Sequence, residues 1–221
     1  MELQEAVIVS GARTPVGRFG GAFKDVSAPD LGETAIRAAL ERAGIPADMV
    51  DEVVLGNALQ ATEAGYAARL ASLRAGVPEE VPTIAINRQC SSGLEAINMA
   101  AQLVRTGEVD IVVAGGIENM SQSPFMLGYQ ARFDGLRMGD ASLVDGLTDG
   151  LGCPVNRYHM GVTAENVAER FGVSREDQDE LALISHTRAA AAVASGRFKG
   201  QITSVEVPQR RADPIIADTD E

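Results

Sequence analysis

The chain has 221 residues, of which 45% are hydrophobic and 23% charged, and its formal net charge is −12. This length and apolar content can bury a core, in one large domain or in one domain with an extra lobe. The charge argues against a dedicated nucleic-acid binder, because phosphate contact needs a clustered basic surface and the 19 Lys and Arg residues are scattered. An anionic small molecule is still compatible, since a few cations or backbone amides can bind phosphate.

The start of the chain, MELQEAVIVSGARTP, places Glu2 and Glu5 where a secretory signal needs positive charge. No apolar run approaches the length that spans a bilayer, so we expect a cytoplasmic protein without a membrane partner. Two cysteines, Cys90 and Cys153, are too few for a disulfide framework and lack the spacing of a zinc site. We therefore expect no metal.

Apolar, β-branched runs alternate with helical patterns along the first half of the chain. This alternation predicts βαβ units and a mostly parallel sheet, hence an α/β fold. The predicted strands are AVIVS (6–10), EVVLG (52–56), TIAIN (83–87) and DIVVAGG (110–116). The predicted helices follow Ser27, run from Tyr66 to Ala75, and run from Cys90 to about Arg105. Gly44, Gly76 and Gly107 are their stop signals.

The pattern changes after residue 120. Residues 121–158 show no sustained period and are too many for an ordinary loop. Two helices are predicted next, at 163–170 and after Ser174, which has capping-box spacing to Asp177. The last stretch has one alternating apolar run and then ends among acids, with no further element expected.

Cys90 stands between a predicted strand and a predicted helix. The positive end of a helix dipole and its unpaired amides favour an anion, so a thiolate is stabilised there and becomes a nucleophile. Ser91, Ser92 and Gly93 are small and would let a carbonyl group approach the sulfur. The local pattern alone also fits a small packed hydrophobic residue, which is the commoner role of such a cysteine.

The segment NRQCSSGLEAI around Cys90 resembles the active-site motif of the thiolase family. Three further segments resemble the family in the same order, and the similarity spans essentially the whole chain. They are SGARTPVGRFGGAF, VVAGGIENMSQSP and YHMGVTAENVAERFGVSREDQD.

The resemblance implies an αβαβα sandwich of two similar halves, with an inserted loop domain that covers coenzyme A. Residues 1–120 would be the N-terminal core half, and 121–221 an incomplete loop domain. In this family the cysteine, here Cys90, is acylated by an acyl-CoA. Coenzyme A is a substrate carrier, no further cofactor is needed, and the enzymes are homodimers or homotetramers. The base, the acid and other oxyanion groups lie in a C-terminal half that this sequence does not contain, so the chain alone should be inactive or nearly so.

The resemblance also assigns residues of the loop domain. His159 and Met160 match the family's HMG motif, which lines the path of the pantetheine and acyl group. Leu147 aligns with a position that lines the coenzyme. Without the motif, a packed or solvated loop is the commoner place for such a histidine, and ordinary packing for such a leucine. His186 is interpreted as a helix residue and Cys153 as a loop thiol.

Several alternatives remain open. NRQCSSGL favours degradative 3-oxoacyl-CoA thiolases, whereas YHMG favours the short-chain acetoacetyl-CoA type. A non-catalytic thiolase-like binding or assembly subunit is a second hypothesis, which the intact cysteine motif disfavours. Decarboxylating condensing enzymes also use a cysteine here, but the GGIENMSQSP and YHMGVTAEN segments favour a thiolase.

Overall fold

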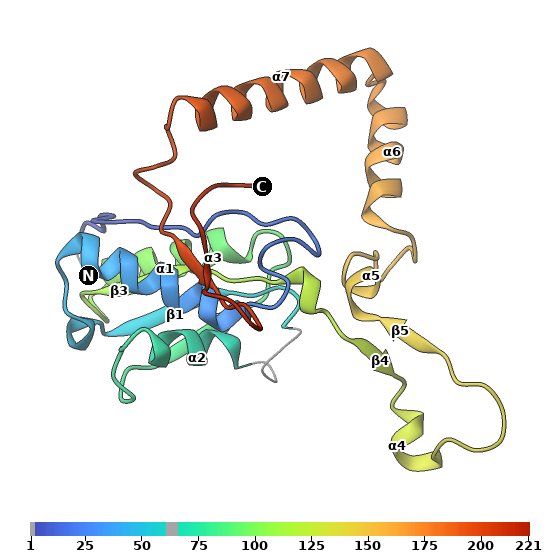
Figure 1. Ribbon diagram of the computed structural model, residues 1–221, viewed down its shortest axis with the longest axis horizontal. Coiled ribbons are helices and arrows are strands. Elements are labelled where there is room, and N and C mark those ends of the chain that lie inside the picture. The colour runs from blue at the N-terminus through green and yellow to red at the C-terminus, as the bar shows by residue number, and fades with distance from the viewer. Residues whose placement is uncertain (1–2, 61–65) are drawn as a thin grey trace. The chain divides into compact units, whose positions relative to one another are not determined.

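The computed structural model describes residues 3–60 and 66–221, which form two compact units (Figure 1). The first unit runs up to Gln122 and also contains Lys199–Glu221, and the second is Ser123–Phe198. The division into a core half, 1–120, and a loop domain, 121–221, stays a prediction, although the contacts group residues 199–221 with the first unit.

A three-stranded parallel sheet forms the centre of the first unit. Its strands are β1 (Glu52–Gly56), β2 (Thr83–Ile86) and β3 (Val112–Gly116), in the spatial order β2-β1-β3. The register places Val53 of β1 between Thr83 of β2 and Val113 of β3. Three of the predicted strands are thus confirmed, with the parallel pairing that the βαβ pattern predicts.

The fourth predicted strand, AVIVS at 6–10, does not form. Val7, Ile8 and Val9 are 69%, 83% and 69% exposed, and these residues belong to no strand. A β-branched run favours an extended backbone, but a strand needs a neighbour to bond with. Among the described residues, none pairs with this run in a ladder. The prediction was wrong because the apolar pattern of a segment shows that it can form a strand, but not whether another strand lies beside it.

Helices α1 (Ala28–Ala43) and α2 (Ala67–Arg74) cover one face of the sheet. The side chain of Ser27 caps α1 by accepting from the backbone N–H of Asp30 at 3.3 Å. Gly44 ends the helix at a φ of 67°, which glycine adopts without penalty. Both helices agree with their predicted positions, and a short 3-10 turn, η1 (Ala47–Met49), leads into β1.

The core follows the alternation of β1. Val53 and Leu55 cluster with Ile36 and Leu40 of α1, with three alanines of α2 and with the alanine that caps it: Ala67, Ala68, Ala71 and Ala75. Successive strand residues point to opposite faces, so Val54, which is fully buried, faces the other side. There α3 (Ser92–Thr106) packs on β1 and β3, so the sheet lies between two helical layers.

The buried face of α3 consists of small residues. Ser92, Ala96 and Ala100 are buried, whereas Leu94 is 63% exposed and Ile97 is 40% exposed. Small side chains let the helix axis lie close to the sheet. Leu94 and Ile97, although large and apolar, therefore do not face the sheet.

The end of the chain folds back on its beginning. Strand β6 (Val205–Val207) pairs antiparallel with β7 (Ile215–Ala217), so the expectation of no element after the first apolar run was wrong. Val205 and Val207 pack with Phe23 and Val26 in a second buried cluster. A hairpin can form here because Phe23 and Val26 of the N-terminal segment supply an apolar surface for it. The sequence pattern of the hairpin does not reveal that surface.

Two acids at the chain end bind the segment 13–22. Arg13 donates to both oxygens of Asp220, at 2.7 and 2.9 Å, and the N–H of Val16 donates to the same carboxylate. One oxygen of Glu221 accepts from the backbone of Arg18 and Ala22. The bonds from Arg13 and Val16 lower the pKa of Asp220, chiefly through the Arg13 side chain.

Replacing Asp220 with asparagine should lower the free energy of unfolding at pH 7 by about 1 to 3 kcal/mol, the range for a charge-assisted hydrogen bond. The pKa of Asp220 is lower in the folded chain, so its contribution is complete above the unfolded value of about 3.9 and disappears as pH falls through the folded value. Urea titrations from pH 7 to pH 3 measure the difference. Asp213→Asn, at an exposed carboxylate, is the control; an equal effect there contradicts the prediction.

The second unit consists of short elements followed by two longer helices. The region without period contains β4 (Phe125–Leu127), α4 (Gln130–Asp134), β5 (Leu143–Asp145) and α5 (Gly146–Gly150), after the turn η3 (Met120–Gln122) of the first unit. The two predicted helices follow as α6 (Met160–Phe171) and α7 (Arg175–Ala194). Ser174 and Asp177 form the predicted capping box. Within the described part of the chain, no helix is long and apolar enough to cross a membrane.

Ser72 of α2 carries a hydroxyl that is fully buried and has no partner among the described residues. An unpaired buried hydroxyl destabilises the folded state, so Ser72→Ala should raise the free energy of unfolding by about 1 kcal/mol. Ser92 is the matched control, because its buried hydroxyl bonds Gln89 and Arg88, and Ser92→Ala should lower stability. Urea unfolding compares the two; a loss of similar size in both variants contradicts the prediction.

Candidate active site

Cys90 lies exposed on the turn that joins β2 to α3. The helix begins at Ser92 with Ser91 as its N-cap, two residues later than predicted. Gln89, directly before the cysteine, has a φ of 51°, a conformation uncommon for a residue with a side chain. Cys90 is therefore presented on a sharp turn at the positive end of α3.

Hydrogen bonds hold this turn closed. The hydroxyl of Ser92 donates to the carbonyl of Gln89 at 2.6 Å and accepts from the N–H of Arg88 at 2.8 Å. The backbone N–H of Ser92 also donates to Gln89, and the hydroxyl of Ser91 donates to Arg88. The two serines thus shape the turn, in addition to being small enough to leave the thiol accessible.

Gly56 lets β1 and α3 meet closely beneath this turn. A Cβ at Gly56 would lie 2.5 Å from the carbonyl carbon of Ser92 and 2.6 Å from the nitrogen of Gly93. Gly116 pairs with Gly56 in the register, and a Cβ there would lie 3.5 Å from the Cα of Gly93. The close approach of β1 and α3 therefore requires a glycine at position 56, whereas a Cβ at Gly116 would make an ordinary contact.

The other predicted site residues belong to the second unit. Leu147 is half-buried in the first turn of α5, where its N–H donates to Asp145. His159 and Met160 lie at the start of α6, and the N–H of Met160 donates to the carbonyl of Leu151 just after α5. The structure brings these three residues onto two connected helix ends within the second unit, whereas Cys90 belongs to the first.

His159 is the N-cap of α6. Its Nδ1 accepts a hydrogen bond from the N–H of Gly161 at 3.0 Å. A ring nitrogen that accepts carries no proton, so the proton of a neutral His159 is on Nε2. In this arrangement the outer nitrogen is a hydrogen-bond donor and not the acceptor that a base needs.

Cys153 lies in a tight turn of the second unit. Its sulfur accepts from the backbone N–H of Asn156 at 3.4 Å. This amide, together with that of Val155, lowers the pKa of the Cys153 thiol. The thiolate is therefore present at a lower pH than for an ordinary thiol, and Cys153 competes with Cys90 for thiol reagents.

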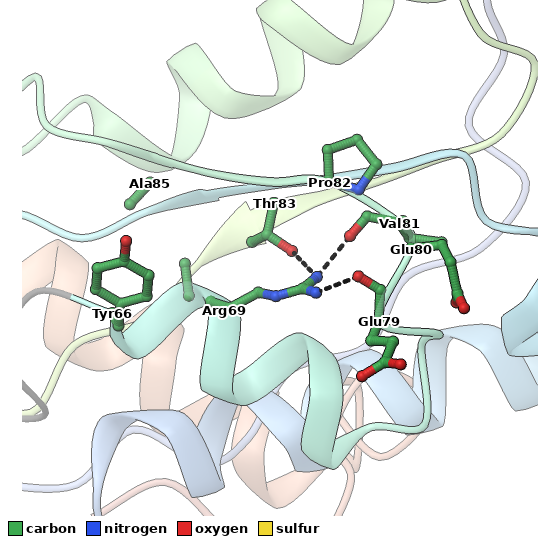
Figure 2. Close-up of a pocket in the computed structure, with 9 residues that line it drawn as sticks. Tyr66, Arg69, Glu79, Glu80, Val81, Pro82, Thr83 and Ala85 are labelled. Carbon is green, nitrogen blue, oxygen red and sulfur yellow. Dashed lines mark hydrogen bonds between the residues drawn. The ribbon is translucent and has the colours of Figure 1, made fainter.

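A cavity with a volume of about 390 Å³ lies elsewhere, beside α2 and β2 (Figure 2). Arg69 donates to the carbonyl groups of Glu79 and Val81 and to the hydroxyl of Thr83. Its guanidinium group thereby ties α2 to the segment that leads into β2. None of the predicted site residues lines this cavity.

Sequence reasoning missed polar residues that follow each strand. Asn57 comes after β1, Asn87 after β2, and Glu118 and Asn119 after β3. Asn57 and Asn119 are buried and hydrogen-bonded to backbone carbonyls. The available signal was an asparagine one to three residues after each strand, since the carboxyl ends of parallel strands meet at one edge.

This geometry defines an α/β protein that presents an exposed thiol on a strand-to-helix turn. The family described as Thiolase, N-terminal domain matches residues 6–221, and the chain belongs to the thiolase family. The acetyl-CoA acetyltransferase of Cupriavidus necator is 49% identical over 220 residues, covering 99% of this chain and 56% of the relative. A protein named probable acetyl-CoA acyltransferase from Staphylococcus aureus is 48% identical with the same coverage.

A solved structure shares the fold. The crystal structure of the Bacillus anthracis acetyl-CoA acetyltransferase matches with a TM-score of 0.94 and 40% identity. The match covers 100% of this chain and 55% of the other. The chain thus spans about half the length of the relatives it matches, and its fold is that of a thiolase N-terminal half with a parallel sheet between helices.

Proposed function

We propose that this chain carries the nucleophile of a thiolase-type acyl-CoA C-acyltransferase. The observation that carries the proposal is the exposure of Cys90 on the tight turn before α3. The names of the relatives, acetyl-CoA acetyltransferase and probable acetyl-CoA acyltransferase, support this chemistry. The family membership supports the proposed role of Cys90 as the residue that accepts the acyl group.

The proposed reaction has two steps. The Cys90 sulfur attacks the 3-oxo carbonyl carbon of a 3-oxoacyl-CoA, and the C2–C3 bond then breaks. The leaving fragment takes a proton and departs as acetyl-CoA, while the shortened acyl group stays on the sulfur as a thioester. The thiol of a second coenzyme A then attacks this thioester, releases the acyl-CoA and returns the proton to the enzyme. In reverse, two acetyl-CoA molecules are condensed.

Further roles belong to the same proposal. His159 and Met160 contact the pantetheine and acyl group, and Leu147 lines the coenzyme. The Nε2 proton of His159 and the 42% exposed side chain of Met160 suit these contacts. A homodimeric or homotetrameric assembly and a cytoplasmic location are also proposed. Base and acid groups outside these 221 residues would be needed for turnover, so the chain alone is expected to be inactive or nearly so.

The test compares the 221-residue chain with the protein purified from its native source. Each is incubated with acetyl-CoA, and mass spectrometry locates any acetyl group. Thiolysis of acetoacetyl-CoA by coenzyme A is then measured. Acetylation at Cys90 with turnover by the native protein supports the proposal, and robust turnover by the 221-residue chain contradicts its inactivity. A native protein that neither acetylates nor turns over favours a binding or assembly subunit.

A further inference from the structure

A polar network joins the carboxyl ends of all three strands. Glu118, two residues after β3, accepts three hydrogen bonds from the segment after β1. Its Oε1 accepts from Nδ2 of Asn57 at 3.0 Å, and its Oε2 accepts from the N–H groups of Ala58 and Leu59 at 2.8 and 3.1 Å. Asn57 is 3% exposed and also donates to the carbonyl of Ile117, so this carboxylate is held firmly.

The network continues from the segment after β1 to the cysteine turn. The side chain of Asn87 donates to the carbonyl of Ala58 at 2.8 Å. The other atom of the same amide group, Oδ1, accepts from the N–H of Gln89 at 3.0 Å. Glu118 is thus connected, through Ala58 and Asn87, to the residue directly before Cys90.

Gln89 is the residue through which this hydrogen-bond network can affect the position of Cys90. Its φ of 51° is strained for a residue with a Cβ, and such a conformation persists only where its surroundings enforce it. The bond from Asn87 and the bonds from Ser92 are the described contacts that fix its amide and its carbonyl. Since the next residue is Cys90, a relaxation of Gln89 redirects the thiol.

We propose that Glu118 is a positioning residue for Cys90, acting through Ala58 and Asn87 on the strained turn at Gln89. Glu118 touches no reacting atom. It fixes the segment after β1, and the carbonyl group of Ala58 in that segment in turn holds the side chain of Asn87. The inference rests on the proposed function only for the identity of Cys90 as the nucleophile. It extends that function to a carboxylate to which neither the motif nor the fold assigned a role.

The matched control is Glu95, a carboxylate of α3 five residues after Cys90. Glu95 bonds Arg88 at 2.5 Å and is not part of the network. Glu95→Gln removes one negative charge near the turn while leaving Asn57, Ala58 and Asn87 untouched. It therefore separates an electrostatic effect on the thiol from an effect of position.

The test measures Glu118→Ala, Asn87→Ala, the double variant and Glu95→Gln. The first readout is thiolysis of acetoacetyl-CoA by the native protein. A misplacement of the nucleophile by about 1 Å can cost roughly a hundredfold, so kcat should fall tenfold to a hundredfold with KM nearly unchanged. Glu95→Gln should change kcat by less than about threefold.

The second readout does not depend on turnover. The alkylation rate of Cys90 by iodoacetamide is measured in the 221-residue chain with Cys153→Ala, and urea unfolding reports whether each variant is folded. Glu118→Ala and Asn87→Ala should change this rate by the same factor, at least about threefold, and the double variant should show no further change. Additive effects, an unchanged rate in Glu118→Ala, or an equal change in Glu95→Gln would overturn the inference. A native protein without acyl transfer refutes the proposed function and leaves the alkylation result to decide this one.

Discussion

Replacing Gly56 with alanine is expected to lower the free energy of unfolding of this chain by about 3 kcal/mol or more. The added Cβ would lie 2.5 Å from the carbonyl carbon of Ser92 and 2.6 Å from the nitrogen of Gly93. These are backbone atoms of the first turn of α3 and cannot move as a flexible side chain can. Overpacking of a rigid contact typically costs 1–3 kcal/mol, and this one forces β1 and α3 apart, so roughly the upper end applies.

The same change should displace Cys90. The first turn of α3 begins two residues after the cysteine, so a shift of this helix end moves the turn that holds the thiol. Gly11→Ala is the matched control, because no atom lies within 4 Å of its added Cβ. Urea unfolding measures both variants, and thiolysis by the native protein measures the consequence for the site. Equal stability of the Gly56 and Gly11 variants would mean that the close approach of β1 and α3 is not required.

Replacing Cys90 with alanine should reduce acyl transfer by the native protein at least about a thousandfold, because a covalent route cannot proceed without its nucleophile. Cys153→Ala is the control and should stay within about threefold, since this thiol is a loop residue of the second unit. Initial rates of thiolysis and the mass of the acetylated protein provide the measurements. Comparable losses in the two variants would assign chemistry to Cys153 and contradict the role given to Cys90.

The lowered pKa of Cys153 affects how these experiments are carried out. Its thiolate is stabilised by the amides of Asn156 and Val155, so it reacts with alkylating reagents at a pH where an ordinary thiol is mostly protonated. Labelling of the unmodified chain therefore reports two thiols. Measurements of Cys90 need the Cys153→Ala background, in which the remaining signal belongs to one residue.

Sequence motifs located the helix ends of this chain well where the few residues of the motif also form the hydrogen bonds of the cap. Ser27 and Gly44 bound α1, and Ser174 with Asp177 caps α7, because each cap is made within one turn of the backbone. The three apolar runs at 52–56, 83–87 and 110–116 became parallel strands for a similar reason. The run at 6–10 had the same composition but no described partner, and it formed no strand.

For the candidate site too, some features follow from neighbouring residues in the sequence and others only from the tertiary structure. The sequence by itself determined the family and the position of Cys90 between a strand and a helix, since both depend on residues adjacent in the chain. Only the tertiary structure decided that Gly56 must lack a side chain, that Glu118 connects to Gln89, and that Asp220 bonds Arg13. Those relations join residues dozens to hundreds of positions apart. They arise because parallel strands bring their carboxyl ends to one edge of the sheet and because the last hairpin packs on the N-terminal segment. The periodicity of a sequence describes one segment at a time and does not predict contacts between distant segments.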